Sequence, residues 1–229
     1  MRHSFARNME RQANKLAEEL DSRSIFGTKC WSSSASLFEK SADRVFIGAN
    51  PGGDRSSQEL DEREGYLDRP YKSQNYNAFL DDTWLGKGPR HQRAVESAFK
   101  AMYDGIWEET LRSTPCFNVV PFRTPTTKSV TRKAWSTGMK WFPIVLEHLS
   151  PSLILCNGSG NNFSAWSAIK GLYSITKIRE QSIGANAFVK TGYVQTGSLR
   201  GSKVVGIPHL ARLGRDSLYE ALESLKPLD

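Results

Sequence analysis

The chain has 229 residues, a formal net charge of +7 and a hydrophobic fraction of 38%. This length suits one α/β domain, and the composition is that of a globular protein, which excludes disordered, collagenous and fibrous classes. No apolar run approaches the ~18 residues of a membrane-spanning helix, and the N-terminal residues carry charges throughout, unlike a signal peptide. We therefore expect a cytoplasmic protein with no membrane partner, associated with the nucleoid if the source is bacterial.

Predicted helices and strands alternate along the chain. Helical spacing of apolar residues predicts helices at 8–20, 90–103, 132–149 (with a break at Pro143) and 215–225, and another that passes through Trp166. Short continuous apolar runs predict buried strands at 44–49, 115–122, 152–156 and 203–207. Weak alternation over 171–199 indicates further short β pieces. Residues 54–89 are polar and rich in turn formers, which predicts a long irregular insertion.

Four buried runs separated by helices indicate a parallel sheet covered on both faces. We therefore predict an α/β protein, a three-layer α/β/α sandwich with a central four-stranded parallel sheet, in a single domain over residues 1–229. Residues 1–40 are expected to form an N-terminal helical extension and residues 54–89 an insertion loop. In such sheets the ligand binds beyond the carboxyl ends of the strands. This rule selects four segments that should meet in one cleft, namely 50–53, 118–127, 157–160 and 209–212.

The chain lacks the motifs of several common hydrolase and cofactor sites. It has no phosphate-binding loop, no G-x-S-x-G elbow and no zinc-ligand spacing, and its three cysteines include no C-x-x-C pair. Gly158-Ser159-Gly160 begins like a dinucleotide fingerprint, but Phe163 stands in place of the third glycine. We therefore expect buried, reduced thiols, no metal and no small-molecule cofactor.

Three motifs lie on or after the predicted strands. They are Gly48-Ala49-Asn50-Pro51-Gly52-Gly53, Phe117-Asn118 and Ile207-Pro208-His209-Leu210. In these motifs, their order and their spacing, the chain resembles the uracil-DNA glycosylase superfamily over residues 43 to about 215. The first motif is similar to the G-x-N-P-G of the mismatch-specific and single-strand-selective branches. The last is similar to the histidine-containing intercalation motif of the superfamily.

The resemblance implies a monofunctional DNA glycosylase, which flips a base out of DNA and hydrolyses its N-glycosidic bond, leaving an abasic site. Asn50 matches the residue that holds and polarises the attacking water, and His209 matches the residue that donates a hydrogen bond to the leaving base. Asn118 matches the amide that reads the base edge, and an amide offers a donor and an acceptor side by side. No lysine lies within the motifs, so no Schiff-base lyase step is expected.

The sequence departs from this pattern at three positions. Asn50 stands where the most active branch has Asp, and Ala211 replaces the serine usual two places after the histidine. Gly52 leaves open a position where that branch places a bulky side chain against the C5 edge of the base. A pocket without this wall need not reject a 5-substituent. The expected substrate is therefore uracil or a modified pyrimidine, and excision of bulky modified bases from phage DNA would serve antiviral defence.

DNA is the expected partner, and we expect a monomer. Residues 170–215 hold eight basic residues and one acidic residue, which predicts attraction to a polyanion. Leu210 and Arg212 are the candidates for the wedge that fills the vacated base stack. Further candidate DNA contacts are Pro51, Gly53, Ser159 with the backbone of Gly158–Gly160 at a helix start, and the basic residues Arg123, Lys128, Arg132, Lys133, Arg200 and Arg215. Candidates for stacking on the base or lining its pocket are Tyr66, Tyr71, Tyr76 and Phe79, with packing in the loop or core as the alternative for each.

Two other functions stay open at this point. A non-catalytic DNA-binding module would keep the basic surface without the chemistry. A small-molecule nucleoside hydrolase would act on free nucleosides and show no salt-dependent affinity for DNA. For Asn50, Asn118 and His209 themselves, the alternatives are a simple turn, a capping residue and a satisfied loop histidine.

Overall fold

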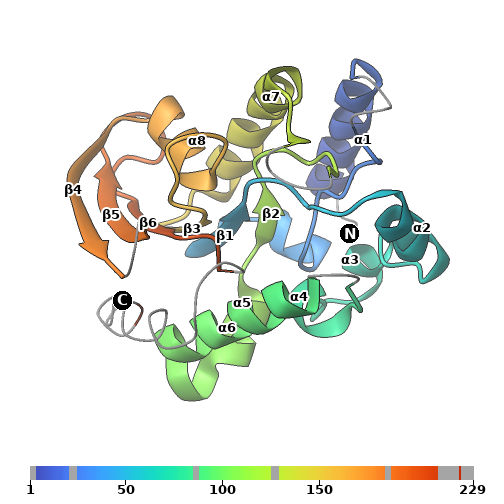
Figure 1. Cartoon of the computed structure of the whole chain (residues 1–229), viewed down its shortest axis with the longest axis horizontal. Helices are drawn as coiled ribbons and strands as arrows, with labels where there is room; N and C mark the ends of the chain where they lie inside the picture. The colour runs from blue at the N-terminus through green and yellow to red at the C-terminus, as the bar shows by residue number, and fades with distance from the viewer. Residues whose placement is uncertain are drawn as a thin grey trace.

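A computed structural model describes residues 4–20, 25–84, 88–124, 129–183, 187–210 and 222. The protein is mixed α/β with a six-stranded sheet in the order β2-β1-β3-β6-β5-β4 (Figure 1). The strands are β1 (Arg44–Gly48), β2 (Cys116–Asn118), β3 (Leu153–Asn157), β4 (Ile175–Ser182), β5 (Phe188–Val194) and β6 (Lys203–Ile207).

The four buried runs form adjacent, mutually parallel strands, β2, β1, β3 and β6. The prediction that the sheet has only these four strands was wrong, because β5 pairs antiparallel with β6 and β4 pairs antiparallel with β5. The continuous apolar signal fails here because β4 lies at the sheet edge and is exposed at nearly every position. Strands of this kind carry few apolar residues, and a β-bulge between Thr176 and Arg179 further disrupts the alternation.

Helices cover both faces of the sheet, as Figure 1 shows. On one face lie α7 (Arg132–Leu149) and α8 (Ala165–Leu172), with α1 (Ser4–Glu18) packed on α7. On the other lie α4 (Ala78–Asp81), α5 (Gly88–Tyr103) and α6 (Trp107–Ser113). Alternate strand residues divide between these layers: Val45 and Ile47 face the α1/α7/α8 side, whereas Phe46 packs with residues of α4 and α5. None of the helices in the described part of the chain is long and apolar enough to span a membrane.

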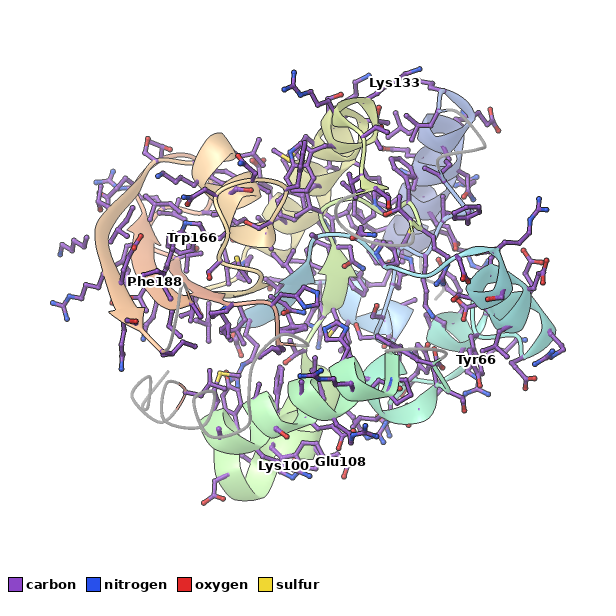
Figure 2. All side chains as sticks on the ribbon, in the orientation of Figure 1. Tyr66, Lys100, Glu108, Lys133, Trp166 and Phe188 are labelled. Carbon is purple, nitrogen blue, oxygen red and sulfur yellow. The ribbon has the colours of Figure 1, made fainter. Side chains whose placement is uncertain are left out.

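Close packing against the sheet is visible at α8. Trp166 lies over the sheet (Figure 2), and a Cβ on Gly206 of β6 would come within 2.7 Å of its ring. Glycine is therefore required at position 206 by the approach of the helix. In contrast, Lys100 of α5 and Glu108 of α6 lie on the outer side of their layer (Figure 2).

The insertion is not an irregular loop. It contains α2 (Arg55–Arg63), α3 (Arg69–Lys72) and α4, and the carboxylate of Asp54 and the amide oxygen of Asn77 accept hydrogen bonds from the first turns of α2 and α4. Short, polar helices show no periodic spacing of apolar residues, so only their N-cap residues could have indicated them in the sequence. Short 3₁₀ helices occur at Ala35–Phe38 and Asp104–Ile106.

Two further expectations concern helices. The break predicted at Pro143 does not occur, because α7 runs through the proline with buried residues on both sides of it. The helix predicted at 215–225 lies outside the described residues except for Leu222, which is buried with the residues of α4, α5 and α6.

Candidate functional site

The carboxyl ends of the four parallel strands lie in register at one edge of the sheet. Gly48 is opposite Asn118, and Asn157 is opposite Ile207. Because Ile47 pairs with Cys156, Gly48 and Asn157 follow at the same level of β1 and β3. The residues two positions earlier in each strand belong to the core beneath α4, α5 and α6, namely Cys116, Phe46, Leu155 and Val205. The row Asn118, Gly48, Asn157 and Ile207 therefore faces that same layer.

The Asn118 amide lies directly against Gly48. A Cβ on Gly48 would stand 2.3 Å from Asn118 Oδ1, so only glycine leaves room for this amide. Asn118 is buried, yet its side chain makes no hydrogen bond to any residue that the structure describes. Within the described ranges, neither the donor nor the acceptor of this amide has a protein partner.

The Asn50 amide has a fixed orientation. Its Nδ2 donates to Thr124 Oγ1 at 2.8 Å and approaches Thr124 O at 3.4 Å. Because the donor end faces Thr124, Oδ1 is turned to the opposite side. No donor among the described residues reaches this oxygen, which can therefore accept a hydrogen bond from water.

Two glycines shape the turn after β1. Gly52 and Gly53 have positive φ of 68° and 93°. A Cβ on Gly52 would meet nothing within 4 Å, whereas one on Gly53 would come within 2.5 Å of Arg123 Nη1. Gly52 therefore borders open space, whereas Gly53 is needed for the close approach of Arg123. Pro51 is partly buried.

Arg123 holds this turn from inside the protein. Its Nη1 donates to Gly52 O at 2.8 Å, its Nη2 pairs with the Asp61 carboxylate, and the residue is 5% exposed. The guanidinium is thus oriented toward the turn and α2 rather than toward solvent, where a DNA phosphate would lie.

A cluster of buried charges lies next to this pair. Lys29 Nζ binds Asp61 at 3.1 Å and Asp82 at 3.3 Å, and the Tyr76 hydroxyl donates to Asp82 at 2.8 Å. Burial raises the pKa of Asp82, and the positive charge of Lys29 opposes this effect. The pKa of Tyr76 is also raised, mainly by burial and to a smaller extent by the neighbouring Asp82 carboxylate. The structure therefore assigns Tyr76 to this cluster and does not bring it to the strand ends.

A pair of histidines lies beyond the ends of β3 and β6. The rings of His209 and His91 are 5.0 Å apart between centroids and tilted by 30°. Asn157 joins their elements, because its Nδ2 lies 2.8 Å from His91 Nε2 and its Oδ1 accepts the Leu210 N–H at 3.1 Å. Burial, with a smaller contribution from His209, lowers the pKa of His91 to about 3. His91 is therefore uncharged at neutral pH.

Aromatic side chains surround His91. Phe79 meets the His91 ring edge-on at 5.8 Å, and Trp84 lies at 5.7 Å. Of the four aromatic residues predicted to stack on the base or line its pocket, Phe79 is the one whose ring contacts His91; Trp84, in the same insertion, was not among those candidates. Tyr71 instead donates a hydrogen bond to Glu10, and Tyr66 packs under the Arg69 guanidinium.

The predicted phosphate site at a helix start is not formed as expected. Helix α8 begins at Ala165, capped by Ser164, so residues 158–160 precede it by several positions. The Gly158 N–H donates to Ile207 O at 2.7 Å, and Ser159 Oγ donates to Phe188 O at 2.8 Å. These two groups attach the loop after β3 to β6 and to β5, respectively.

The two wedge candidates have different outcomes. Leu210 is 1% exposed and packs in the core beneath α4, α5 and α6, so it does not present the free side chain that a wedge needs. Arg212 lies outside the described residues, as do Lys128 and Arg215.

Three residues of this edge were missed or misjudged in the sequence. His91 had a usable signal, since it shares a helical face with Val95, Ala98 and Met102 and so interrupts an apolar stripe. Thr124 gave no signal beyond its place in the segment after β2. Asn157 was singled out only as part of a Gly-rich turn, and its role in joining His91 to Leu210 needs the fold.

Two pockets formed by described residues lie away from this edge of the sheet. One of about 720 Å³ lies at the opposite edge of the sheet, where Arg44 begins β1 and Pro115 precedes β2. Another of about 390 Å³ borders Tyr76 and Arg112. Within the described ranges, no group of three or more His, Cys, Asp or Glu is arranged to hold a metal ion.

A scan against protein-family models, a search of curated proteins and a search of solved structures each found no match to this chain. The family resemblance of the three motifs therefore stays a prediction.

Proposed function

We propose that the protein is a monofunctional DNA glycosylase that excises uracil or a modified pyrimidine. One observation carries this proposal: three residues from different parts of the chain belong to the same edge of the sheet. Asn118 is the last residue of β2, whereas Asn50 and His209 each lie two positions after the end of a strand, β1 and β6 respectively. Only β3 separates β1 from β6, and two inter-strand spacings amount to about 10 Å. That span suits a nucleoside held between Asn50 and His209.

In the proposed reaction, the C1′–N bond breaks and its electron pair leaves with the base. A water molecule held by Asn50 Oδ1 adds its oxygen to C1′, and its proton passes to solvent. A neutral amide is not a strong base, so most of the rate must come from stabilising the positive sugar and the departing base anion. His209 supplies a hydrogen bond to that anion, and Asn118 reads the base edge with its unused donor and acceptor.

The open space at Gly52 bears on the substrate. Since a Cβ there would meet no atom within 4 Å, nothing at this position walls off a substituent on the base. This supports a pyrimidine with a 5-substituent as an alternative to uracil. Defence against phage DNA with modified bases is the corresponding biological role.

The decisive experiment incubates the protein with normal, uracil-containing and phage-modified DNA and identifies any released base by mass spectrometry. Asn50→Ala and His209→Ala should lower the release rate by about 10²–10⁴-fold while DNA binding persists. The matched control is Asn75→Ala at an exposed position, which should release base like the wild type.

A DNA-binding module without chemistry is the second candidate, favoured by the burial of Leu210, which removes the expected wedge. Wild-type protein that binds every DNA in the panel yet releases no base would support it. Activity on free nucleosides, without salt-dependent DNA affinity, would instead identify a nucleoside hydrolase.

A further inference from the structure

His91, Asn157 and Leu210 connect three separate elements. His91 lies in the first turns of α5, Asn157 ends β3, and Leu210 follows β6 directly after His209. The single Asn157 side chain contacts both other residues, at 2.8 Å and 3.1 Å. It therefore fixes the loop that carries His209 relative to α5.

Hydrogen-bond chemistry sets the direction of this chain. A backbone N–H can only donate, so the Asn157 atom that faces Leu210 must be the oxygen. The Asn157 atom that faces His91 is then the NH₂ group, and His91 Nε2 must accept. An imidazole that accepts at Nε2 carries its proton on Nδ1 and is uncharged.

We propose that His91 is a positioning residue of the proposed glycosylase site: its Nε2 anchors Asn157, and its uncharged ring packs against the His209 ring. The proposal rests on the proposed function and adds a residue that the three motifs do not contain. His209 is the titratable group that faces the His91 ring among the described residues; its other ring neighbours are Phe79 and Trp84. A second charge at His91 would repel a positive charge on His209 at close range.

The arrangement can be tested without any activity. The chain has four histidines, so the imidazole nitrogens of ¹⁵N-histidine-labelled protein can be assigned by comparison with His91→Gln. We expect the Nδ1–H tautomer for His91 and no titration between pH 8 and pH 5. An Nε2–H tautomer, or titration within that interval, would overturn the proposal even if the protein proves to be a glycosylase.

The functional test separates the hydrogen bond from the ring. His91→Gln keeps an acceptor for Asn157, whereas His91→Phe keeps an aromatic ring and removes the acceptor. We expect His91→Phe to lower the single-turnover rate of base release by up to about 10²-fold through misplacement of His209, with unchanged DNA affinity, and His91→Gln to restore most of it. His148→Gln, on α7, is the matched control and should behave like the wild type.

Asn157→Asp supplies a readout that a merely structural role would not move. A carboxylate still accepts the Leu210 N–H but cannot donate to Nε2, and it favours a protonated His91. The pH profile of base release should therefore gain an additional ionisation. Equal losses in His91→Gln and His91→Phe, an unchanged profile in Asn157→Asp, or losses seen only in DNA affinity or stability would refute the positioning role. If the wild type releases no base, the proposed function fails, and the tautomer measurement still judges the arrangement.

Discussion

Three amides at the sheet edge have three different sets of partners. The NH₂ group of Asn50 donates to Thr124, and the two ends of the Asn157 amide bond to His91 and to Leu210. The Asn118 amide forms no hydrogen bond with a described residue. An amide whose partners are all protein groups is structural, whereas one with unused groups can bind a ligand. This distinction, rather than residue type, separates Asn157 from Asn118.

Thr124→Val tests the orientation of Asn50. Removal of the hydroxyl leaves Asn50 Nδ2 with only the weaker contact to Thr124 O, so the amide can rotate and lose its hold on water. The lost hydrogen bond is worth about 1 kcal/mol, which corresponds to a roughly fivefold slower release of base. Thr124→Ser keeps the hydroxyl and should retain the wild-type rate. Equal rates in the valine and serine variants, measured in single turnover, would argue against this role.

The low pKa of His91 predicts a pH dependence of stability. The folded value of about 3 lies below the ordinary 6.5, so between these limits the unfolded chain binds more protons than the folded one. The contribution of the uncharged His91 to the free energy of unfolding is complete above pH 6.5. It is lost as the pH falls toward 3, by at most about 1.4 kcal/mol per pH unit. Urea unfolding at pH 7, 6 and 5 should show a steeper loss for the wild type than for His91→Gln. Parallel losses in both proteins would contradict the shift.

The candidate ligand-binding residues were easier to find in the sequence than the residues that contact and orient them. The convergence of strand ends in a parallel sheet selected the segments that contain Asn50, Asn118 and His209, and this rule needs only the order of apolar runs. The resemblance of the three motifs then singled out the residues within those segments. The hydrogen bond between Asn50 and Thr124 joins residues 74 positions apart in the sequence, and the one between Leu210 and Asn157 joins residues 53 positions apart. Such pairings depend on register and loop geometry, which local patterns do not encode.

At the scale of elements, the insertion is held to the site by buried charges. Asp61 of α2 forms ion pairs with Arg123, in the segment after β2, and with Lys29, in the segment before β1. The continuous apolar runs identified the four parallel strands, but the short helices of the insertion have no hydrophobic period. Their position depends on these ion pairs, whose partners the sequence pattern does not reveal.

Arg123→Gln should therefore destabilise the fold. Removing one partner of a buried ion pair costs about 3–5 kcal/mol, and the lower end is expected because Lys29 still neutralises Asp61. Arg112→Gln is the control, since Arg112 pairs with Asp81 in a partly exposed setting and should cost about 1 kcal/mol or less. Urea unfolding measures both. Unchanged stability in Arg123→Gln, together with a weaker salt dependence of DNA binding, would restore Arg123 as a phosphate contact.

Across the whole molecule, the two antiparallel strands extend the sheet beyond β6. Two antiparallel steps give β4 the same direction as β6, so Ser182 at its carboxyl end lies at the edge that carries the candidate site. Lys177 and Arg179 on β4 are exposed, and neither forms an ion pair with a described residue. An exposed sheet edge with uncompensated positive charge is suited to a phosphate backbone.

The salt dependence of DNA binding tests this extension. Each phosphate neutralised on duplex DNA contributes about −0.9 to the slope of log K against log salt concentration. Replacing both Lys177 and Arg179 by Gln should therefore reduce the magnitude of the slope by up to about 1.8. The control replaces Arg63 and Lys72, which are exposed but paired with Glu64 and Asp68, and should leave the slope nearly unchanged. Equal effects of the two double variants would show that net charge alone drives binding, and no effect of either would place the DNA away from β4.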